Sequence, residues 1–107
     1  MTQAERIQTI ETVVEHVNGR APVIAGSGAN NTETAVQASR EIAKIGVDAL
    51  LVVTPYYNKA TPRGLIRHYT AVADAVRKPV ILYNVPPRTG VRCTAEVYAA
   101  LAKHPNI

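Results

Sequence analysis

The apolar residues of this chain follow two kinds of pattern. Four segments repeat them every three to four positions, which is typical of a helix with one buried face. Three shorter segments are continuously apolar, which is typical of buried strands. We expect helices at residues 2–18, 31–45, 61–76 and 94–104, and strands at residues 22–25, 49–54 and 79–83.

Residues with strong positional preferences mark the ends of these segments. Thr2 and Glu5 have the spacing of a capping box at the start of the first helix. Pro62 follows Thr61 in a position that suits the first turn of the third helix. Gly19 and Gly46 are expected to end the first two helices, and Pro105 the last. Residues 49–54 carry no polar side chain before Thr54, so this strand is expected to be buried on both faces.

The order of the elements predicts an α/β fold. A helix is followed by three strand–helix units whose strands begin near residues 22, 49 and 79, an interval of about thirty residues that a right-handed βα repeat requires. Three parallel strands cannot close a barrel, and we expect residues 104–107 to lead into another strand. Residues 1–107 are therefore expected to be a central piece of a larger (β/α)8 barrel domain.

Composition excludes several classes of protein. The net charge is +4, but the twelve Lys and Arg residues are scattered, which indicates a solvated basic surface rather than a nucleic-acid site. Cys93 is the only cysteine, so the chain forms no internal disulfide. No apolar run is long enough for a membrane span and the N-terminus does not resemble a signal peptide, so we expect a cytoplasmic protein without membrane contacts.

The three histidines carry no metal-binding pattern. His16, His68 and His104 are far apart and lack the short spacings of zinc ligands, so we expect exposed helical histidines and no metal site.

Polar side chains gather where the second and third strands end. Tyr57 and Tyr83 offer hydroxyl groups that can both donate and accept a proton. Arg88 follows two prolines that stiffen its turn, and a held guanidinium suits a carboxylate. From the spacing alone, rim packing for the tyrosines and a plain surface position for the arginine remain open alternatives.

The glycines at residues 26 and 28 raise the possibility of a dinucleotide-binding loop. The third glycine of that fingerprint is replaced by Asn31, and no acidic residue ends the second strand. A tight turn between strand and helix accounts for these glycines more simply.

Three motifs together resemble the dihydrodipicolinate synthase family over essentially all 107 residues. They are Val-Ile-Ala-Gly-Ser-Gly-Ala-Asn at residues 23–30, Val-Thr-Pro-Tyr-Tyr-Asn at 53–58, and Leu-Tyr-Asn-Val-Pro-Pro-Arg-Thr-Gly at 82–90. The resemblance implies a TIM barrel and a lyase of lysine and diaminopimelate biosynthesis, which has no cofactor. Such enzymes form a Schiff base between pyruvate and a lysine and condense it with L-aspartate 4-semialdehyde.

The resemblance also assigns roles to residues. Tyr83 corresponds to the phenol beside the Schiff base, and Tyr57 to a relay tyrosine that crosses into the neighbour's site in a homodimer or homotetramer. Arg88 corresponds to the residue that receives the semialdehyde carboxylate. Tyr56, Asn30 and Gly28 line up with an interface cleft for lysine feedback, where Thr34 replaces a glutamate of some members.

The Schiff-base lysine of the family has no counterpart here. The resemblance places it four residues past Ile107, and a Gly-Thr-Thr-Gly motif before Met1, so residues 1–107 would span helix 2 to helix 5 of the family's barrel and be inactive alone. Lys44, Lys59, Lys78 and Lys103 are expected on helices or loops, where an amine is not desolvated. A sialic-acid (N-acetylneuraminate) lyase, a keto-sugar-acid aldolase and a non-catalytic barrel piece remain alternatives.

Overall fold

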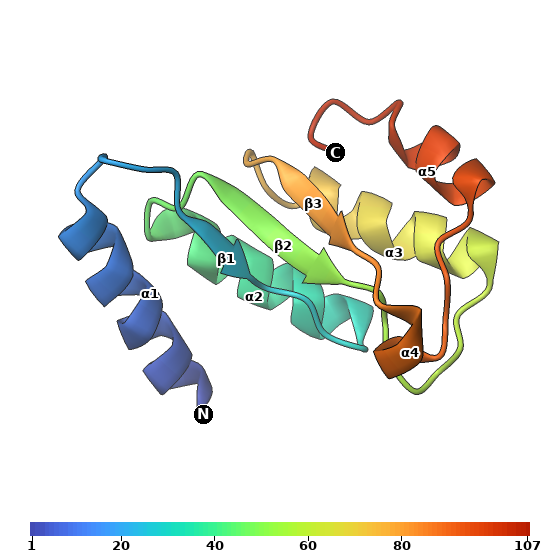
Figure 1. Ribbon diagram of the computed structural model, residues 1–107, viewed down its shortest axis with the longest axis horizontal. Helices are drawn as coiled ribbons and strands as arrows, with labels where there is room; N and C mark the ends of the chain where they lie inside the picture. Colours follow the sequence, from blue (N-terminus) through green and yellow to red (C-terminus); the bar gives the residue numbers. More distant parts are fainter.

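The computed structural model describes all 107 residues as one layer of parallel sheet with helices beside it (Figure 1). The elements are, in chain order, α1 (Gln3–Val17), β1 (Ile24–Gly26), α2 (Thr32–Lys44), β2 (Ala49–Val53), α3 (Pro62–Asp74), β3 (Val80–Tyr83), α4 (Pro86–Thr89) and α5 (Ala95–Leu101). The helix followed by three strand–helix units is therefore confirmed, with an additional short helix after β3.

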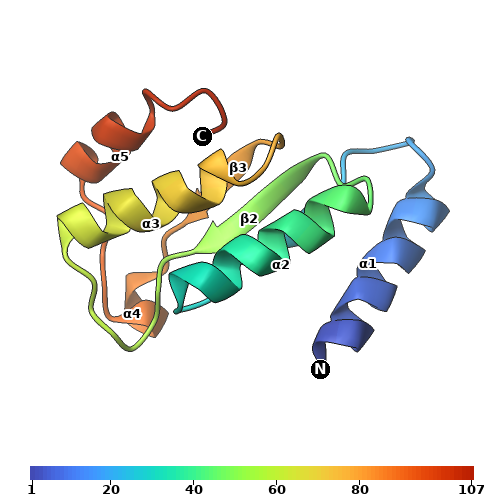
Figure 2. The ribbon, with the colours of Figure 1, turned by 180° about the vertical axis from the view of Figure 1, so that it is seen from behind.

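The three strands are parallel in the order β1-β2-β3, so each pairs with its neighbour in the sequence. Gly26 pairs with Leu51, and Val53 with Tyr83. Helices α2 and α3 lie against one face of this sheet, and α5 lies beside α3 (Figures 1 and 2). Helix α1 lies beside the β1 edge of the sheet (Figure 1). This is the arrangement that consecutive right-handed βα units produce.

The hydrophobic core lies between the sheet and helices α2 and α3. Strand residues that alternate along the chain point into it, among them Leu50, Val52 and Val80, which are buried. The opposite face is open: Ile24 is 52% exposed and Ile81 40% exposed. The expectation that β2 is buried on both faces is therefore wrong, because Leu51 and Val53 are half-buried on the face that no helix covers.

The predicted helix starts are largely confirmed. Thr2 and Glu5 make both bonds of a capping box. Thr61 Oγ1 accepts a hydrogen bond of 3.1 Å from Gly64 N, with Pro62 at the first helical position. Thr94 precedes α5 but makes no capping bond, and α5 ends at Leu101, well before the proline that was expected to stop it.

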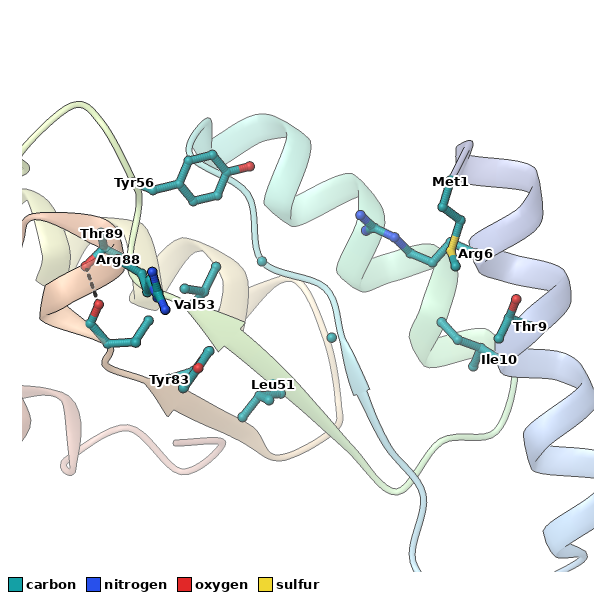
Figure 3. A pocket seen from close by; sticks show the side chains of 13 residues that line it. Met1, Arg6, Thr9, Ile10, Leu51, Val53, Tyr56, Tyr83, Arg88 and Thr89 are labelled. Atoms are coloured by element: carbon teal, nitrogen blue, oxygen red, sulfur yellow. Dashed lines mark hydrogen bonds between the residues drawn. The ribbon is translucent and has the colours of Figure 1, made fainter.

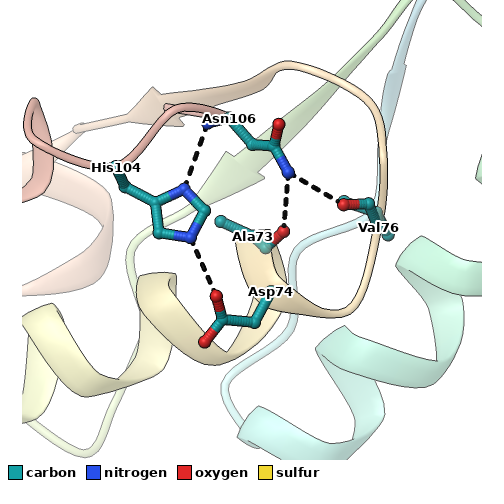
Figure 4. Close-up of polar contacts among 5 residues, drawn as sticks. All are labelled: Ala73, Asp74, Val76, His104 and Asn106. Carbon is teal, nitrogen blue, oxygen red and sulfur yellow. Dashed lines mark hydrogen bonds and ion pairs between the residues drawn. The ribbon is translucent and has the colours of Figure 1, made fainter.

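The prediction of exposed helical histidines is correct only for His16. His68 is buried between α3 and the start of α2. His104 lies after α5, and its Nε2 forms a 2.9 Å hydrogen bond with Asp74 Oδ1 (Figure 4). Helical spacing shows which face a histidine occupies, but not which neighbouring element covers that face.

The end of the chain is tied to α3 and β3. The Asn106 side chain donates to the carbonyl oxygens of Ala73 and Val76 (Figure 4). The backbone carbonyl of Asn106 accepts a 2.7 Å bond from Val80 N. Residue 106 therefore lies beside the start of β3, as a neighbouring parallel strand would. None of the helices has the length and apolar character needed to cross a bilayer.

Candidate functional site

A cavity of about 680 Å³ opens on the uncovered face of the sheet, toward the carboxyl ends of the strands (Figure 3). Its walls come from the sheet, from α1 and from α4. The lining residues are Met1, Arg6, Thr9, Ile10, Gly26, Gly28, Leu51, Val53, Tyr56, Tyr83, Val85, Arg88 and Thr89. The carboxyl ends of parallel strands are where α/β proteins place their binding sites, because the loops that follow the strands meet there.

Tyr83 reaches this cavity because of the strand period. Val80 is buried toward the helices, so residues 81 and 83 of the same strand point to the open face. Tyr83 is 45% exposed and faces the cavity together with its pairing partner Val53 (Figure 3). The phenol is therefore accessible from the cavity.

Arg88 is held by a single helical turn. Pro86 and the three residues after it form α4, in which Arg88 N donates to Val85 O at 2.9 Å and Thr89 Oγ1 donates to the same oxygen at 3.3 Å. Gly90 ends the turn with φ +71°, a conformation that favours glycine. The prolines therefore start a helical turn. Such a turn fixes the backbone that carries the guanidinium.

Tyr56 and Tyr57 point in different directions. Tyr56 lines the cavity (Figure 3), whereas Tyr57 is 88% exposed and does not line it. Their rings contact edge to face, with centroids 5.7 Å apart. Within one chain, the structure therefore brings Tyr83, Arg88 and Tyr56 to the same cavity but leaves Tyr57 outside it.

Gly28 lines the cavity for a steric reason. A Cβ atom at this position would lie 2.6 Å from Val53 N and 2.9 Å from Val53 Cγ1, so the loop after β1 can approach β2 only with glycine. Asn30 is not part of the lining, and its carbonyl oxygen accepts a 2.8 Å bond from Asn58 Nδ2. Close packing on β2 explains this glycine without a nucleotide.

The contribution of α1 to the cavity was missed in the sequence. Arg6, Thr9 and Ile10 are three and four residues apart and so share one helix face, which is a signal that spacing offers. No carboxylate and no lysine belongs to the lining, so the charged side chains of the cavity are those of Arg6 and Arg88. Such a cavity suits an anion.

Two other titratable groups near the sheet are structural. Burial raises the pKa of the Tyr69 hydroxyl far above its usual value, and this hydroxyl donates to Val52 O at 3.1 Å. Burial also raises the pKa of the Cys93 thiol, which keeps it protonated and unreactive. No cluster of three or more His, Cys, Asp or Glu side chains is placed to hold a metal ion.

Known proteins closely match both the sequence and the fold. The 4-hydroxy-tetrahydrodipicolinate synthase of Geobacter metallireducens is 55% identical over 103 residues, which are 96% of this chain and 36% of that protein. The Macrococcus caseolyticus enzyme of the same name is 50% identical over all 107 residues, again 36% of its length. This chain therefore spans about a third of the length of these relatives.

Solved structures agree. The chloride-inhibited dihydrodipicolinate synthase of Acinetobacter baumannii in complex with pyruvate superimposes with a TM-score of 0.98 at 47% identity, covering 100% of this chain and 37% of that one. The Cyanidioschyzon merolae enzyme with lysine bound gives a TM-score of 0.97 at 43% identity, over 100% and 37% of the two chains. The three-stranded sheet is thus part of a TIM barrel. The model of the dihydrodipicolinate synthetase family matches residues 1–107, and the chain belongs to this family.

Proposed function

We propose that this chain forms part of a 4-hydroxy-tetrahydrodipicolinate synthase, a lyase of the diaminopimelate route to lysine. The observation that carries the proposal is the placement of Tyr83 and Arg88 on one cavity at the carboxyl ends of the strands. Relatives with this name are 50% or more identical over nearly the whole chain. The substrates would be pyruvate and L-aspartate 4-semialdehyde.

Tyr83 would move protons in this reaction. When an amine attacks the pyruvate carbonyl, the new hydroxyl must be protonated to leave as water, and the resulting imine must lose a methyl proton to become the nucleophilic enamine. A phenol can donate and accept a proton in such steps. Because no lysine lines the cavity, the amine would come from a part of the enzyme outside these 107 residues.

Arg88 would bind the carboxylate of the second substrate. Its guanidinium is in no ion pair within the chain, and the turn of α4 fixes its backbone. A planar fork with two parallel N–H groups matches a carboxylate, and a fixed backbone reduces the entropy lost on binding.

Tyr57 would act in the site of a second subunit. It is 88% exposed and has φ +72°, a strained value for a tyrosine, so it presents its ring away from its own cavity. Large exposed aromatic side chains favour interfaces. We propose that the ring enters a neighbouring subunit and completes the proton relay there, which requires a homodimer or homotetramer.

Tyr56, Gly28 and Asn30 would form part of a regulatory or subunit-interface cleft. Tyr56 and Gly28 line the cavity, and Asn30 anchors the loop after Tyr57 through its carbonyl oxygen. Thr34 lacks the carboxylate that would pair with the amino group of lysine, so we expect weak inhibition by lysine or none.

The test uses the longer enzyme that contains this sequence. Pyruvate should be consumed with L-aspartate 4-semialdehyde and not with sugar aldehydes. Replacing Arg88 by alanine should lower kcat/KM for the semialdehyde by a factor of about 100, because a charged hydrogen-bonding pair is lost. Capture of pyruvate should persist in this variant. A preference for sugar aldehydes would reassign the chain to an aldolase or sialic-acid lyase. No turnover with either aldehyde would contradict an enzymatic role.

A further inference from the structure

His68 is a buried polar residue that the proposed reaction does not use. It lies in α3 and is only 4% exposed. Its Nδ1 lies 2.9 Å from Thr32 Oγ1, and its ring contacts that of Tyr69 edge to face with centroids 5.4 Å apart. Burial lowers the pKa of the imidazole, so the ring is neutral near pH 7.

The contacts also determine which ring nitrogen holds the proton. Nε2 of His68 is buried without a hydrogen-bond partner. A buried N–H group without an acceptor is rarer than a buried acceptor without a donor. We therefore assign the proton to Nδ1, whose N–H then donates a hydrogen bond to Thr32 Oγ1.

Thr32 connects this histidine to the loop of Tyr57. It is the first residue of α2, directly after the cap residue Asn31, whose side chain accepts from Thr34 N. One residue earlier, the carbonyl oxygen of Asn30 accepts the 2.8 Å bond from Asn58 Nδ2. The hydrogen bond between His68 of α3 and Thr32 of α2 is thus two residues along the chain from the Asn30 carbonyl, which binds the loop of Tyr57.

The loop that carries Tyr57, residues 55–59, is held by few hydrogen bonds. Tyr57 and Lys59 both have positive φ, at +72° and +43°. Such conformations persist only where the surroundings impose them. The bond from Asn58 to Asn30 is the one hydrogen bond made by residues 55–59.

We propose that His68 is a positioning residue for Tyr57. Through Thr32 it fixes the start of α2, which places the Asn30 carbonyl so that Asn58 can hold Tyr57 in its strained, outward conformation. The importance of this for catalysis rests on the proposed function, in which Tyr57 serves a neighbouring subunit, but the positioning itself does not.

The experiment compares two variants of one exposed residue in the full chain. Thr32→Val keeps the shape of the side chain and removes the hydroxyl, whereas Thr32→Ser keeps the hydroxyl. Backbone amide order parameters from NMR relaxation should fall at residues 57–59 in Thr32→Val, from about 0.85 toward about 0.6 or lower, and should stay at the wild-type value in Thr32→Ser. Asn58→Ala should reproduce the loss at residues 57–59.

His68→Phe provides an independent arm, because phenylalanine fills the same space and offers no hydrogen bond. It should loosen residues 57–59 as Thr32→Val does, while the amide of the core residue Leu50 keeps its order parameter. Unchanged order at residues 57–59 in Thr32→Val would overturn the proposal, and so would loosening spread equally over Leu50. These measurements need no substrate, so failed turnover would bear on the proposed function alone.

Discussion

The packing of the loop after β1 explains why residue 28 is a glycine. Because a Cβ there would meet the backbone nitrogen of Val53 at 2.6 Å, Gly28→Ala must push the loop away from β2. We expect a loss of about 1–3 kcal/mol in the free energy of unfolding, as in other overpacked sites. Urea unfolding followed by circular dichroism measures this loss.

The matched control for this substitution is in the same motif. A Cβ at Gly26 would have nothing within 4 Å, so Gly26→Ala should leave stability unchanged or raise it, since alanine loses less backbone entropy on folding. Equal stability of the two variants would show that contact with Val53 does not explain Gly28.

The buried hydroxyl of Tyr69 leads to a prediction of how the stability of the chain changes at alkaline pH. Its buried hydroxyl has a raised pKa in the folded chain, whereas the unfolded chain ionises near the ordinary value of 10.0. The folded state therefore holds more protons above pH 10, so this residue makes stability decrease as pH rises from there. Unfolding free energies between pH 9 and about 11 should fall, and less steeply in Tyr69→Phe. Parallel pH profiles would contradict this account.

Local spacing in the sequence predicted some residues of the candidate site and not others. Tyr83 and Arg88 were predicted because polar side chains after apolar strands meet at one edge of a parallel sheet, a rule of local spacing. Tyr57 lies outside that cavity and has a positive φ, a backbone value that no pattern of apolar and polar residues indicates. The family resemblance supplied its expected role across an interface, which stays a prediction.

At the scale of elements, apolar spacing located the four longer helices and all three strands. It missed α4, because two consecutive prolines in a short segment predict a stiff turn equally well, and the hydrogen bonds to Val85 O decide for a helical turn. It also misjudged β2, since a continuous apolar strand indicates burial on both faces but does not show whether a second layer is present.

The helix starts differ in a way that stability measurements can test. Thr61 caps α3 through a hydrogen bond to Gly64 N, whereas Thr94 makes no capping bond to α5. Thr61→Ala should therefore cost about 1 kcal/mol of stability, and Thr94→Ala clearly less. Thermal unfolding of the two variants side by side measures the difference, and an equal cost would show that the bond to Gly64 contributes nothing.

At the scale of the whole molecule, the open sheet face is the dominant feature. Helices α2 and α3 cover one face, while Ile24, Ile81 and Tyr83 on the other are 40% or more exposed. In a TIM barrel this face is the interior, which side chains from all eight strands fill together, and residues 1–107 supply three of those strands. The core between the sheet and helices α2 and α3 is therefore formed within this chain, whereas the opposite face of the sheet is uncovered.

The distribution of lysines leads to the last prediction. None of the four lysines lines the cavity, and Lys44, Lys59 and Lys103 are exposed to water, whereas a lysine that forms a Schiff base needs a desolvating pocket or a second cation beside it. Pyruvate with borohydride should therefore leave this chain unmodified, as measured by intact mass, while the longer enzyme gains one reduced pyruvate adduct. An adduct on any lysine of this chain would contradict this account, because it would show that an amine outside the cavity is reactive.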